Sequence, residues 1–412
     1  MRATTLLLHL LGLKTLRVLS FEVGDFGLVV DVAPRTRRPY CSGCGRPVRR
    51  LYDRRVRTWR HLDFAGMAVH LRYGLRRVEC KRCGIVSELV PWAEHNSGFT
   101  RAFEEAVAWM AQRMDQSSVC ALMGIAWRTV GRIAARVVER LGPTDRLDGL
   151  THIGIDELSY RRHHKYLTVV TDHLRGRVVW VAEGRSADTL GKFFDALGDE
   201  RAAKLKVVTL DMCEAYIGAL QKRAPQAKLV FDRFHVQRLA HDALDAVRRA
   251  QVRERKGTPE GKAIKKTRFV LQKRPWRLNL DEEERLSAVQ RTNQALYRAY
   301  LLKESLATVF DEPVVEIARE RLRQWMAWAT RSRLAPFRKV ARTLRRHLDG
   351  VLGYVATGLS NARAEGLNGK IRTITRRAYG FHDASSLIGF IFLCCSGLTL
   401  QPPQERLRLA RP

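Results

Sequence analysis

The chain has 412 residues, enough for two or three domains, each with its own core. It carries 74 lysines and arginines against 42 aspartates and glutamates, a formal net charge of +32, so we expect a polyanionic partner, with nucleic acid first. The apolar runs 6–11 and 387–398 are shorter than the roughly 18–20 residues of a membrane span, and no clear cleavage site follows the first. These features exclude a membrane anchor of the usual kind, and we expect a cytoplasmic protein with no membrane partner.

Four of the eight cysteines form two CxxC knuckles. Two such knuckles supply four thiolates, which match the tetrahedral coordination of structural zinc. The second and third of these cysteines are 36 positions apart, and residues 57–78 between the knuckles alternate as strands do, which indicates a small β insert. Disulfides are the alternative, but they are rare in the cytoplasm. We predict one structural Zn²⁺ bound by Cys41, Cys44, Cys80 and Cys83.

Helical spacing follows in three segments, 99–114, 116–123 and 126–141, with Gly124 between the last two. A short helix, a glycine turn and a basic helix are typical of a helix-turn-helix motif that reads double-stranded DNA. A helical hairpin with a solvated basic face is the alternative. The residues that we predict to contact DNA bases or phosphates are Arg128, Thr129, Arg132 and Arg136.

From Thr151 the period of the sequence changes to that of strands. We predict strands over 152–156, 166–171, 177–182, 206–210 and 228–231, and helices over 186–197 and 212–223. Strands that alternate with helices pair in parallel, so the first and fourth strands are expected to be neighbours. Asp156 and Asp211 would then lie side by side where these strands end, at the edge where open α/β sheets bind ligands.

Two neighbouring carboxylates repel each other unless a cation lies between them. Mg²⁺, or Mn²⁺ in its place, is the natural ion for such oxygen ligands. Residues 360–372 offer a third carboxylate, because Asn361, Glu365, Asn368 and Arg372 share one face of a predicted helix. The alternatives are that strand-ending aspartates simply favour turns, and that this helix face is solvated.

Asp232 and His235 form a D-x-x-H pair just after the last predicted strand. The histidine could donate a hydrogen bond to a phosphate or orient a carboxylate. A helix-capping aspartate beside a packed histidine is the plainer alternative. Glu157 and Asp172 are further carboxylates that stand at less favourable positions.

Residues 245–352 are strongly basic and have helical spacing throughout, which predicts an all-α insertion that supports DNA. Its aromatic residues stand mostly at core spacing, and we expect them to pack: Trp276, Tyr297, Tyr300, Trp325 and Trp328.

The chain resembles transposases of the ISL-three family of bacterial insertion sequences over nearly its whole length. Five stretches carry the resemblance in addition to the two CxxC knuckles: 153–157 (IGIDE), 210–212 (LDM) with Tyr216, 231–236 (FDRFHV), 358–368 (GLSNARAEGLN) and 379–381 (YGF). The resemblance implies a ribonuclease-H-like catalytic domain with a DDE triad. By motif, Asp156, Asp211 and Glu365 are that triad, and Asp232 and His235 stand beside it.

The same resemblance implies what the chain does. The zinc module and the helix-turn-helix would bind the terminal inverted repeats of the element. Two Mg²⁺ or Mn²⁺ ions at the triad would support hydrolysis at the element ends and transfer of the freed 3′-hydroxyl to target DNA. We also predict DNA contacts near the triad, from their places on or beside the helix that carries Glu365: Asn361, Asn368, Lys370 and Arg372. A homo-oligomer that bridges two ends is also implied.

The predicted architecture is a multidomain α/β protein. It has a zinc-ribbon-like module over 1–95, a helix-turn-helix over 96–145, and a ribonuclease-H-like core over 150–244 that resumes at 353–400 after the all-α insertion 245–352; residues 401–412 form a tail. Two other functions remain open from the residues alone. One is a DNA-binding regulator with an inactive nuclease-like domain, and the other is a nuclease without strand transfer.

Overall fold

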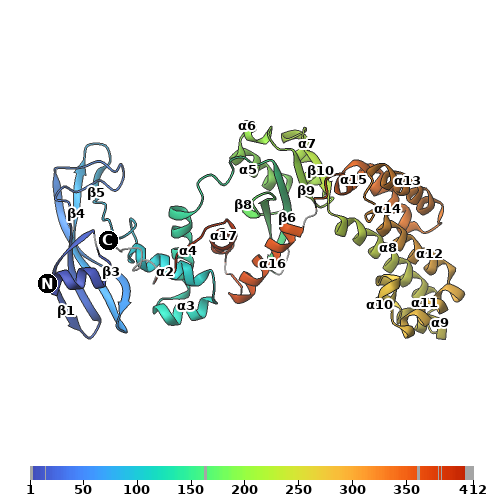
Figure 1. The fold of residues 1–412 in the computed structure, drawn as a ribbon, viewed down its shortest axis with the longest axis horizontal. Helices are drawn as coiled ribbons and strands as arrows, with labels where there is room; N and C mark the ends of the chain where they lie inside the picture. The colour runs from blue at the N-terminus through green and yellow to red at the C-terminus, as the bar shows by residue number, and fades with distance from the viewer. Residues whose placement is uncertain are drawn as a thin grey trace. The chain divides into compact units, whose positions relative to one another are not determined.

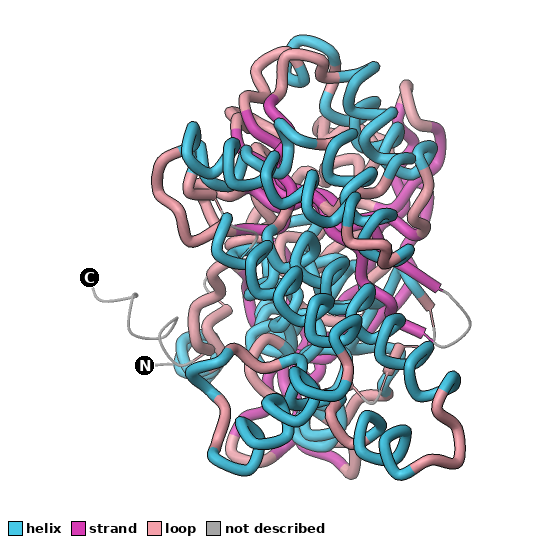
Figure 2. The backbone as a smooth tube through the Cα atoms, turned by 90° about the vertical axis from the view of Figure 1, so that its right-hand side faces the viewer, coloured by secondary structure: helices cyan, strands magenta, loops and turns pink. Residues whose placement is uncertain are grey.

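The computed structural model describes residues 3–13, 15–161, 165–359, 362–378, 380–381 and 383–403, with backbone only at 362 and 363. The chain divides into two compact units. The first consists of Met1–Pro143 and Ile374–Pro412, and the second of Thr144–Thr373. Figure 1 labels the elements along the chain, and Figure 2 distinguishes helix from strand.

The first unit begins with a helix and a five-stranded sheet. The strand order is β1-β2-β4-β3, with β5 on β4, and only the β2–β4 pair is parallel. Trp59 and Leu71 are fully buried in its core, because alternate residues of the long strands face inward. This is the β insert that the alternation between the knuckles predicts. The elements are α1 (Ala3–Leu10), β1 (Leu16–Gly24), β2 (Gly27–Pro34), β3 (Leu51–Phe64), β4 (Met67–Cys80) and β5 (Gly84–Ser87).

Three helices of the first unit form the predicted helix-turn-helix: α2 (Arg101–Ala111), α3 (Gln116–Met123) and α4 (Trp127–Leu141). Gly124 ends α3 in the left-handed conformation, which opens the turn into α4. The stripe Val130, Ile133 and Val137 of α4 is fully buried, as its spacing predicts.

A helix from the far end of the sequence packs on this motif. α17 (Ala384–Cys395) belongs to the first unit, and Gly389 on α17 faces Ala135 on α4 at van der Waals distance. The apolar run from Leu387 is thus a buried helix, as expected. No helix among the described residues is long and apolar enough to cross a bilayer. The unit boundary at Thr373 divides the segment 353–400, which we expected to be one part of the catalytic core.

The second unit contains a five-stranded mixed sheet of order β10-β9-β6-β7-β8. β6, β7 and β8 are antiparallel neighbours, whereas β9 and β10 run parallel to β6. The predicted parallel pairing of the first and fourth strands is therefore confirmed. This α/β sheet is the catalytic core that the resemblance implies. The elements are β6 (His152–Arg161), β7 (Lys165–Asp172), β8 (Arg177–Glu183), α5 (Ala187–Leu197), α6 (Asp199–Ala202), β9 (Val207–Leu210), α7 (Glu214–Arg223) and β10 (Lys228–Phe231).

The first strand of this sheet is longer than predicted. Asp156 stands in the middle of β6, opposite Val169 of β7, and does not end the strand. Only the parallel partner β9 ends here, at Leu210, whereas β6 continues on β7, and β7 stays paired with β8 as far as Leu167. The prediction that β6 ends at Asp156 was wrong, because the pairing with β7 extends the strand.

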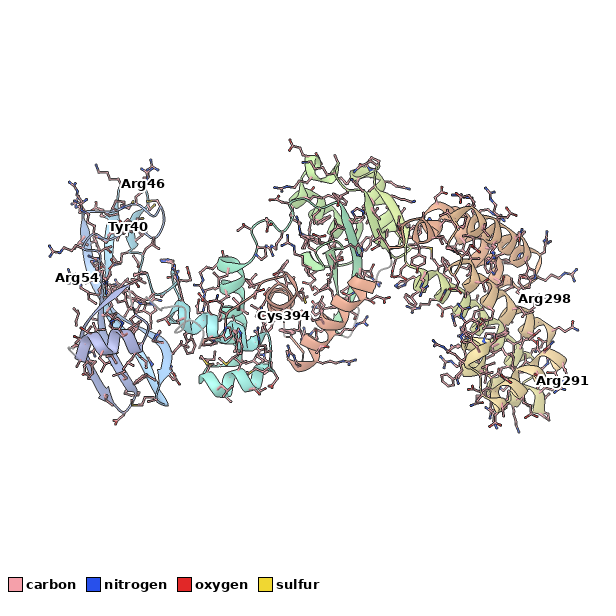
Figure 3. All side chains as sticks on the ribbon, in the orientation of Figure 1. Tyr40, Arg46, Arg54, Arg291, Arg298 and Cys394 are labelled. Carbon is pink, nitrogen blue, oxygen red and sulfur yellow. The ribbon has the colours of Figure 1, made fainter. Side chains whose placement is uncertain are left out.

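The remaining helices form the predicted all-α insertion and the return to the sheet. One hydrophobic core joins sheet residues such as Ile155 and Phe231 to helix residues such as Trp325 and Leu344. The elements are α8 (Arg233–Glu254), α9 (Pro259–Lys265), α10 (Arg268–Gln272), η1 (Pro275–Arg277), α11 (Leu280–Thr292), α12 (Gln294–Val309), α13 (Val315–Arg331), α14 (Ala335–Arg346), α15 (Leu348–Thr357) and α16 (Ala362–Arg377). Figure 3 shows the dense cover of side chains on the insertion, with Arg291 and Arg298 labelled.

Candidate active site and zinc site

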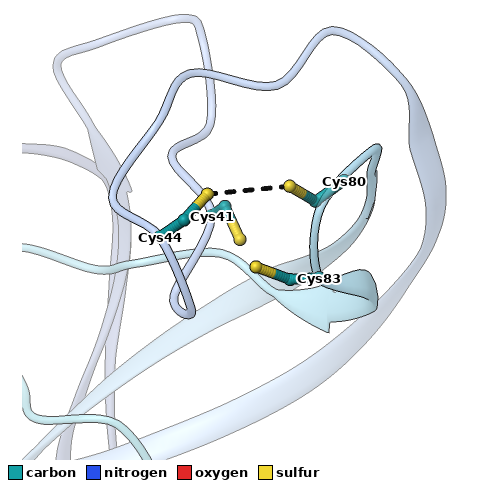
Figure 4. Close-up of side chains that lie close together, drawn as sticks. All are labelled: Cys41, Cys44, Cys80 and Cys83. Carbon is teal, nitrogen blue, oxygen red and sulfur yellow. Dashed lines mark hydrogen bonds between the residues drawn. The ribbon is translucent and has the colours of Figure 1, made fainter.

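The four predicted zinc ligands converge in the β module. Cys41 and Cys44 come from the loop before β3, whereas Cys80 ends β4 and Cys83 precedes β5. The four sulfur atoms lie within 4.8 Å of one another, and the Sγ atoms of Cys44 and Cys80 are 3.7 Å apart (Figure 4). Four sulfurs in this arrangement form a zinc site, as the two knuckles predict.

Local electrostatics favour a bound cation at this site. Hydrogen bonds from the backbone amides of Arg82 and Cys83 lower the pKa of the Cys80 thiol to about 7. The neighbouring Cys41 thiol, followed by burial, raises the pKa of Cys83 to about 12. Thiols packed this closely can become thiolates together only when a cation offsets their mutual repulsion.

Two predicted catalytic carboxylates stand in line across the sheet of the second unit. The parallel pairing of β6 and β9 places Gly154 opposite Thr209, so Asp156 and Asp211, each two residues further on, continue the same register. Gly154 permits this close pairing, because a Cβ there would stand 2.8 Å from the side chains of both Thr171 and His173. The absence of a side chain at Gly154 thus leaves room for its neighbours two residues before Asp156.

The register extends to a third aspartate. Phe231 of β10 is opposite Leu210 of β9, so Asp232 continues the row next to Asp211. Asp232 is buried and caps α8, where its Oδ1 accepts a hydrogen bond of 2.6 Å from the backbone amide of Phe234. The capping alternative for Asp232 is therefore correct for one of its two carboxylate oxygens.

Asp156 is strongly perturbed by its surroundings. Burial, followed by the charge of Asp211, raises the pKa of Asp156 to about 6. Its Oδ1 accepts a 2.7 Å hydrogen bond from the backbone amide of Glu157, and its Oδ2 accepts one from Nδ2 of Asn368. A carboxyl that is held by neutral donors and repelled by another carboxylate attracts a cation.

His235 lies against the second aspartate. Its Nε2 is 2.8 Å from Oδ1 of Asp211, and this contact raises the pKa of the histidine. His235 is only half-buried, so the ring reaches the carboxylate edge from the first turn of α8. The alternative in which His235 is simply packed in the core does not fit this contact.

Glu365 comes from the first turn of α16, which runs beside β6 (Figure 1). Its side chain is exposed, yet desolvation raises its pKa, and the negative charges of Asp232 and Asp211 act in the same direction. Glu365 therefore lies near enough to Asp232 and Asp211 for their charges to act on it. The distant segment 362–373 is brought to the strands because Asn368 of the same helix is buried against Asp156.

These residues fit divalent ions. Among the described residues, Oδ2 of Asp232 and Oδ1 of Asn368 are buried without a hydrogen-bond partner, and the buried Oδ1 of Asp211 has only the ion-pair contact with His235. Buried oxygens without a hydrogen-bond partner, next to carboxyl groups whose pKa is raised, are suited to bind a hard cation such as Mg²⁺. Within the described part of the chain, only the four cysteines have their ligand atoms mutually within 4.8 Å. The ligand atoms of the acidic residues are thus further apart than those of the four cysteines.

Two predicted DNA contacts have other partners in the structure. Asn368 is almost fully buried, and its amide holds Asp156, so it does not offer an exposed contact to DNA. Arg136 of α4 points inward, and its Nη2 is 2.6 Å from Oε1 of Glu104, a fully buried residue of α2. In the structure each of these donors therefore has an acidic partner within the protein, and a DNA contact by either residue stays a prediction.

The other predicted contacts keep their predicted places. Arg128 and Arg132 are exposed on α4, and Thr129 is half-buried. Lys370 and Arg372 are exposed on α16, and the charge of Arg372 lowers the pKa values of Asp156 and Glu365. Asn361 lies outside the described residues.

The two further carboxylates have different positions. Asp172 is buried at the end of β7, where its Oδ1 accepts hydrogen bonds from the amides of Leu174 and Arg175, so it stabilises the turn that follows. Glu157 is half-buried, and burial raises its pKa, while Tyr216 donates a hydrogen bond to it. Sequence reasoning missed Glu104, because nothing in the local pattern of α2 distinguishes an acid that turns inward.

A transposase family model matches residues 153–391, which include the sheet, the insertion and α16. A model of the helix-turn-helix domain of transposase family ISL3 matches residues 88–138. A model of the zinc-finger of transposases IS204, IS1001, IS1096 and IS1165 matches residues 37–83. The three matches cover the zinc site, the DNA-binding helices and the acidic site in turn.

Similar full-length proteins are known. The transposase for insertion sequence element IS1557 of Mycobacterium tuberculosis is 39% identical over 432 residues, which cover 96% of this chain and 96% of that protein. The transposase for insertion sequence element IS1001 of Bordetella parapertussis is 29% identical over 360 residues, or 86% and 88% of the two chains.

The fold and the site define the class of protein: a DDE transposase that carries its own zinc module and helix-turn-helix. Within that class, the chain belongs to the ISL3 family of insertion-sequence transposases.

Proposed function

We propose that this transposase binds the terminal inverted repeats of its element, hydrolyses the DNA at the element ends and transfers the freed strands to target DNA. One observation carries the proposal: Asp156 and Asp211 stand in line on adjacent parallel strands, and α16, which carries Glu365, is attached to Asp156 by a hydrogen bond from Asn368. Phosphoryl transfer needs little covalent chemistry from a protein, so positioned charge is the main requirement.

Each residue has a proposed role. Asp156, Asp211 and Glu365 hold two Mg²⁺ or Mn²⁺ ions, which when bound activate the attacking oxygen and stabilise the leaving oxygen. His235 orients Asp211 through a hydrogen bond that its Nε2 donates to the carboxylate. Asn368 fixes Asp156 through Nδ2 and leaves its unpartnered Oδ1 toward the same site. Asp232 adds a further carboxylate oxygen at the end of β10.

The remaining parts position DNA. Arg128 and Arg132, with Thr129 between them, are proposed to enter the major groove of the inverted repeat. Lys370 and Arg372 extend from the helix that carries Glu365, where they would hold phosphates near the reacting bond. Because an element has two ends, a homo-oligomer that holds both is part of the proposal.

The test uses purified full-length protein, duplexes that carry its own element ends, and Mg²⁺ or Mn²⁺. We expect wild type to release a 3′-hydroxyl at the end and to join it to a second duplex. Glu365→Gln keeps the size of the side chain and removes its charge, so cleavage should fall by about a thousandfold or more, in line with the loss of several kcal/mol of charge stabilisation. Glu283→Gln, an exposed site on α11, is the matched control.

The outcomes separate the three functions that the residues leave open. Equal cleavage by wild type and Glu365→Gln would rule out the triad. Binding of the ends without metal-dependent cleavage would indicate a regulator. Cleavage without any joined product would indicate a nuclease.

A further inference from the structure

The helical insertion contains a basic and aromatic segment that the catalytic site does not explain. Residues 262–277 (KAIKKTRFVLQKRPWR) contain seven lysines and arginines and no acidic residue. They cover the end of α9, all of α10 and the short helix η1. Figure 1 shows α9, α10 and α11 gathered at one end of the insertion.

Two aromatic side chains of this segment project into solvent. Phe269 is 69% exposed and Trp276 is 71% exposed, although Val270 and Leu271 beside them are buried. The expectation that Trp276 packs in the core was therefore wrong. Val270 and Leu271 are the buried residues of the short helix α10, and Phe269 lies on its exposed side. Trp276 follows Pro275 in the short helix η1, which has no buried residue.

Each exposed ring is backed by an arginine. The guanidinium carbon of Arg274 lies 5.3 Å from the centre of the Trp276 ring, and that of Arg268 lies 5.7 Å from the centre of the Phe269 ring. Such cation–π contacts leave the rest of each ring open to a second planar partner.

The arginine behind Trp276 is itself anchored. Its Nη1 is 3.4 Å from Glu304 and its Nη2 is 3.7 Å from Asp311. The nearly buried ammonium of Lys303 donates a 3.1 Å hydrogen bond to the backbone oxygen of Lys273, next in the chain to Arg274. The guanidinium that contacts the Trp276 ring is thus held in place by its acidic partners, so little conformational entropy is lost when a ligand stacks on the ring.

We propose that Trp276 and Phe269 form a stacking site for unpaired DNA bases, with the surrounding cations on the phosphates. Stacking on exposed aromatic rings beside a positively charged track is how proteins bind single strands. The cations available for phosphates are exposed residues of the same segment: Lys262, Lys265, Lys266, Arg268 and Arg277. Because the segment is positively charged and contains no acidic residue, we favour DNA over another protein as its ligand.

This proposal rests on the proposed function, because strand cleavage and transfer produce the unpaired bases that the site would take. The experiment therefore measures binding alone, with no added divalent ion, so it does not depend on cleavage. The ligand is a short single-stranded oligonucleotide with one 2-aminopurine, and the same sequence as a blunt duplex serves for comparison. Binding is followed by anisotropy, and stacking by quenching of the 2-aminopurine fluorescence.

Trp276→Ala should weaken single-strand binding by about 5- to 150-fold, as expected for the loss of one stacked base, and should abolish the quenching. Duplex binding should change by less than about twofold, because the phosphate contacts remain. Trp276→Tyr should restore both signals, since it keeps an aromatic face. Leu280→Ala, an 83% exposed apolar site on the adjacent helix, is the matched control and should bind as wild type does.

Three outcomes would overturn the proposal. Single-strand binding by Trp276→Ala equal to that of wild type would exclude stacking there. Equal weakening of single-strand and duplex binding would show that the ring does not recognise bases. A lower molecular mass of Trp276→Ala in sedimentation would assign the ring to self-association. Phe269→Ala is a second variant, and it should weaken single-strand binding in the same direction but by less. If wild type does not cleave DNA in the assay of the proposed function, that result bears on the proposed function and not on the stacking site.

Discussion

Asn368 of α16 donates a hydrogen bond from Nδ2 to Oδ2 of Asp156 in the middle of β6, across 212 positions of sequence. This contact attaches the helix that carries Glu365 to the strand that carries the first aspartate. The side chain is almost fully buried, so solvent does not compete for the bond. Asn368 therefore determines how the third carboxylate meets the other two.

Asn368→Ala should lower metal-dependent cleavage about 10- to 100-fold, the usual effect of removing a group that orients a metal ligand. The affinity for Mn²⁺, measured by titration calorimetry, should fall in parallel, which a purely structural role would not cause. Thr373→Ala, on the exposed side of the same helix, is the control. Unchanged Mn²⁺ affinity in Asn368→Ala would contradict this role.

Arg132 and Arg136 are one helical turn apart on α4 and should behave differently. Arg132→Gln should weaken binding to the inverted repeat and reduce the salt dependence of binding, because an exposed cation is lost. Thermal stability should be unchanged. Binding is measured by anisotropy at several salt concentrations, and an unaltered affinity would remove Arg132 from the interface.

Arg136→Gln should instead destabilise the helix-turn-helix by about 3–5 kcal/mol, because it leaves the fully buried Glu104 charged and without its arginine. Denaturant unfolding followed by circular dichroism measures this loss. The double variant Arg136→Gln with Glu104→Gln should recover part of the stability. A single variant as stable as wild type would show that the pair contributes little.

Removal of zinc should unfold the module that contains the four cysteines. Structural zinc contributes folding free energy directly, and the cluster is surrounded by only a small apolar core, Val48 and Val78 with two of the cysteines. Chelation, or Cys41→Ser, should abolish the thermal transition of the module and weaken binding of the inverted repeat. Metal analysis should give one zinc per chain. Cys120→Ser, outside the site, should retain the zinc, and a chelated protein with an unchanged transition would contradict a structural role.

The β module should also lose stability at low pH through Asp31. The hydrogen bonds that Asp31 accepts from Arg72, and then from Ser20, lower its pKa from 3.8 to about 2. A carboxyl with a lowered pKa stabilises the fold above about pH 4, and this contribution disappears as the pH falls toward 2. Asp31→Asn should therefore lower the free energy of unfolding by about 1 kcal/mol at pH 7, since both partners are partly exposed.

The two proteins should become equally stable near pH 2. Thermal melts of wild type and Asp31→Asn between pH 2 and 7 measure the difference. Asp25→Asn, for which no ion pair occurs among the described residues, is the control. A constant difference across this pH range would exclude Asp31 as its cause.

The sequence by itself determined the four zinc ligands, the three helices of the helix-turn-helix region and the order of the five strands of the catalytic sheet. Each of these is encoded locally, because CxxC spacing, strand alternation and helical periodicity depend on residues a few positions apart. The parallel pairing of the first and fourth strands also followed from the alternation of strands with helices.

Only the tertiary structure decided which partner each polar side chain takes. Asn368 and Arg136 read as outward contacts in the sequence, but a buried carboxylate from a distant segment holds each of them. Trp276 reads as a core residue, yet the fold leaves it in solvent on an anchored arginine. The physical reason is that burial and hydrogen bonding depend on distances between segments far apart in the chain, which periodicity does not record.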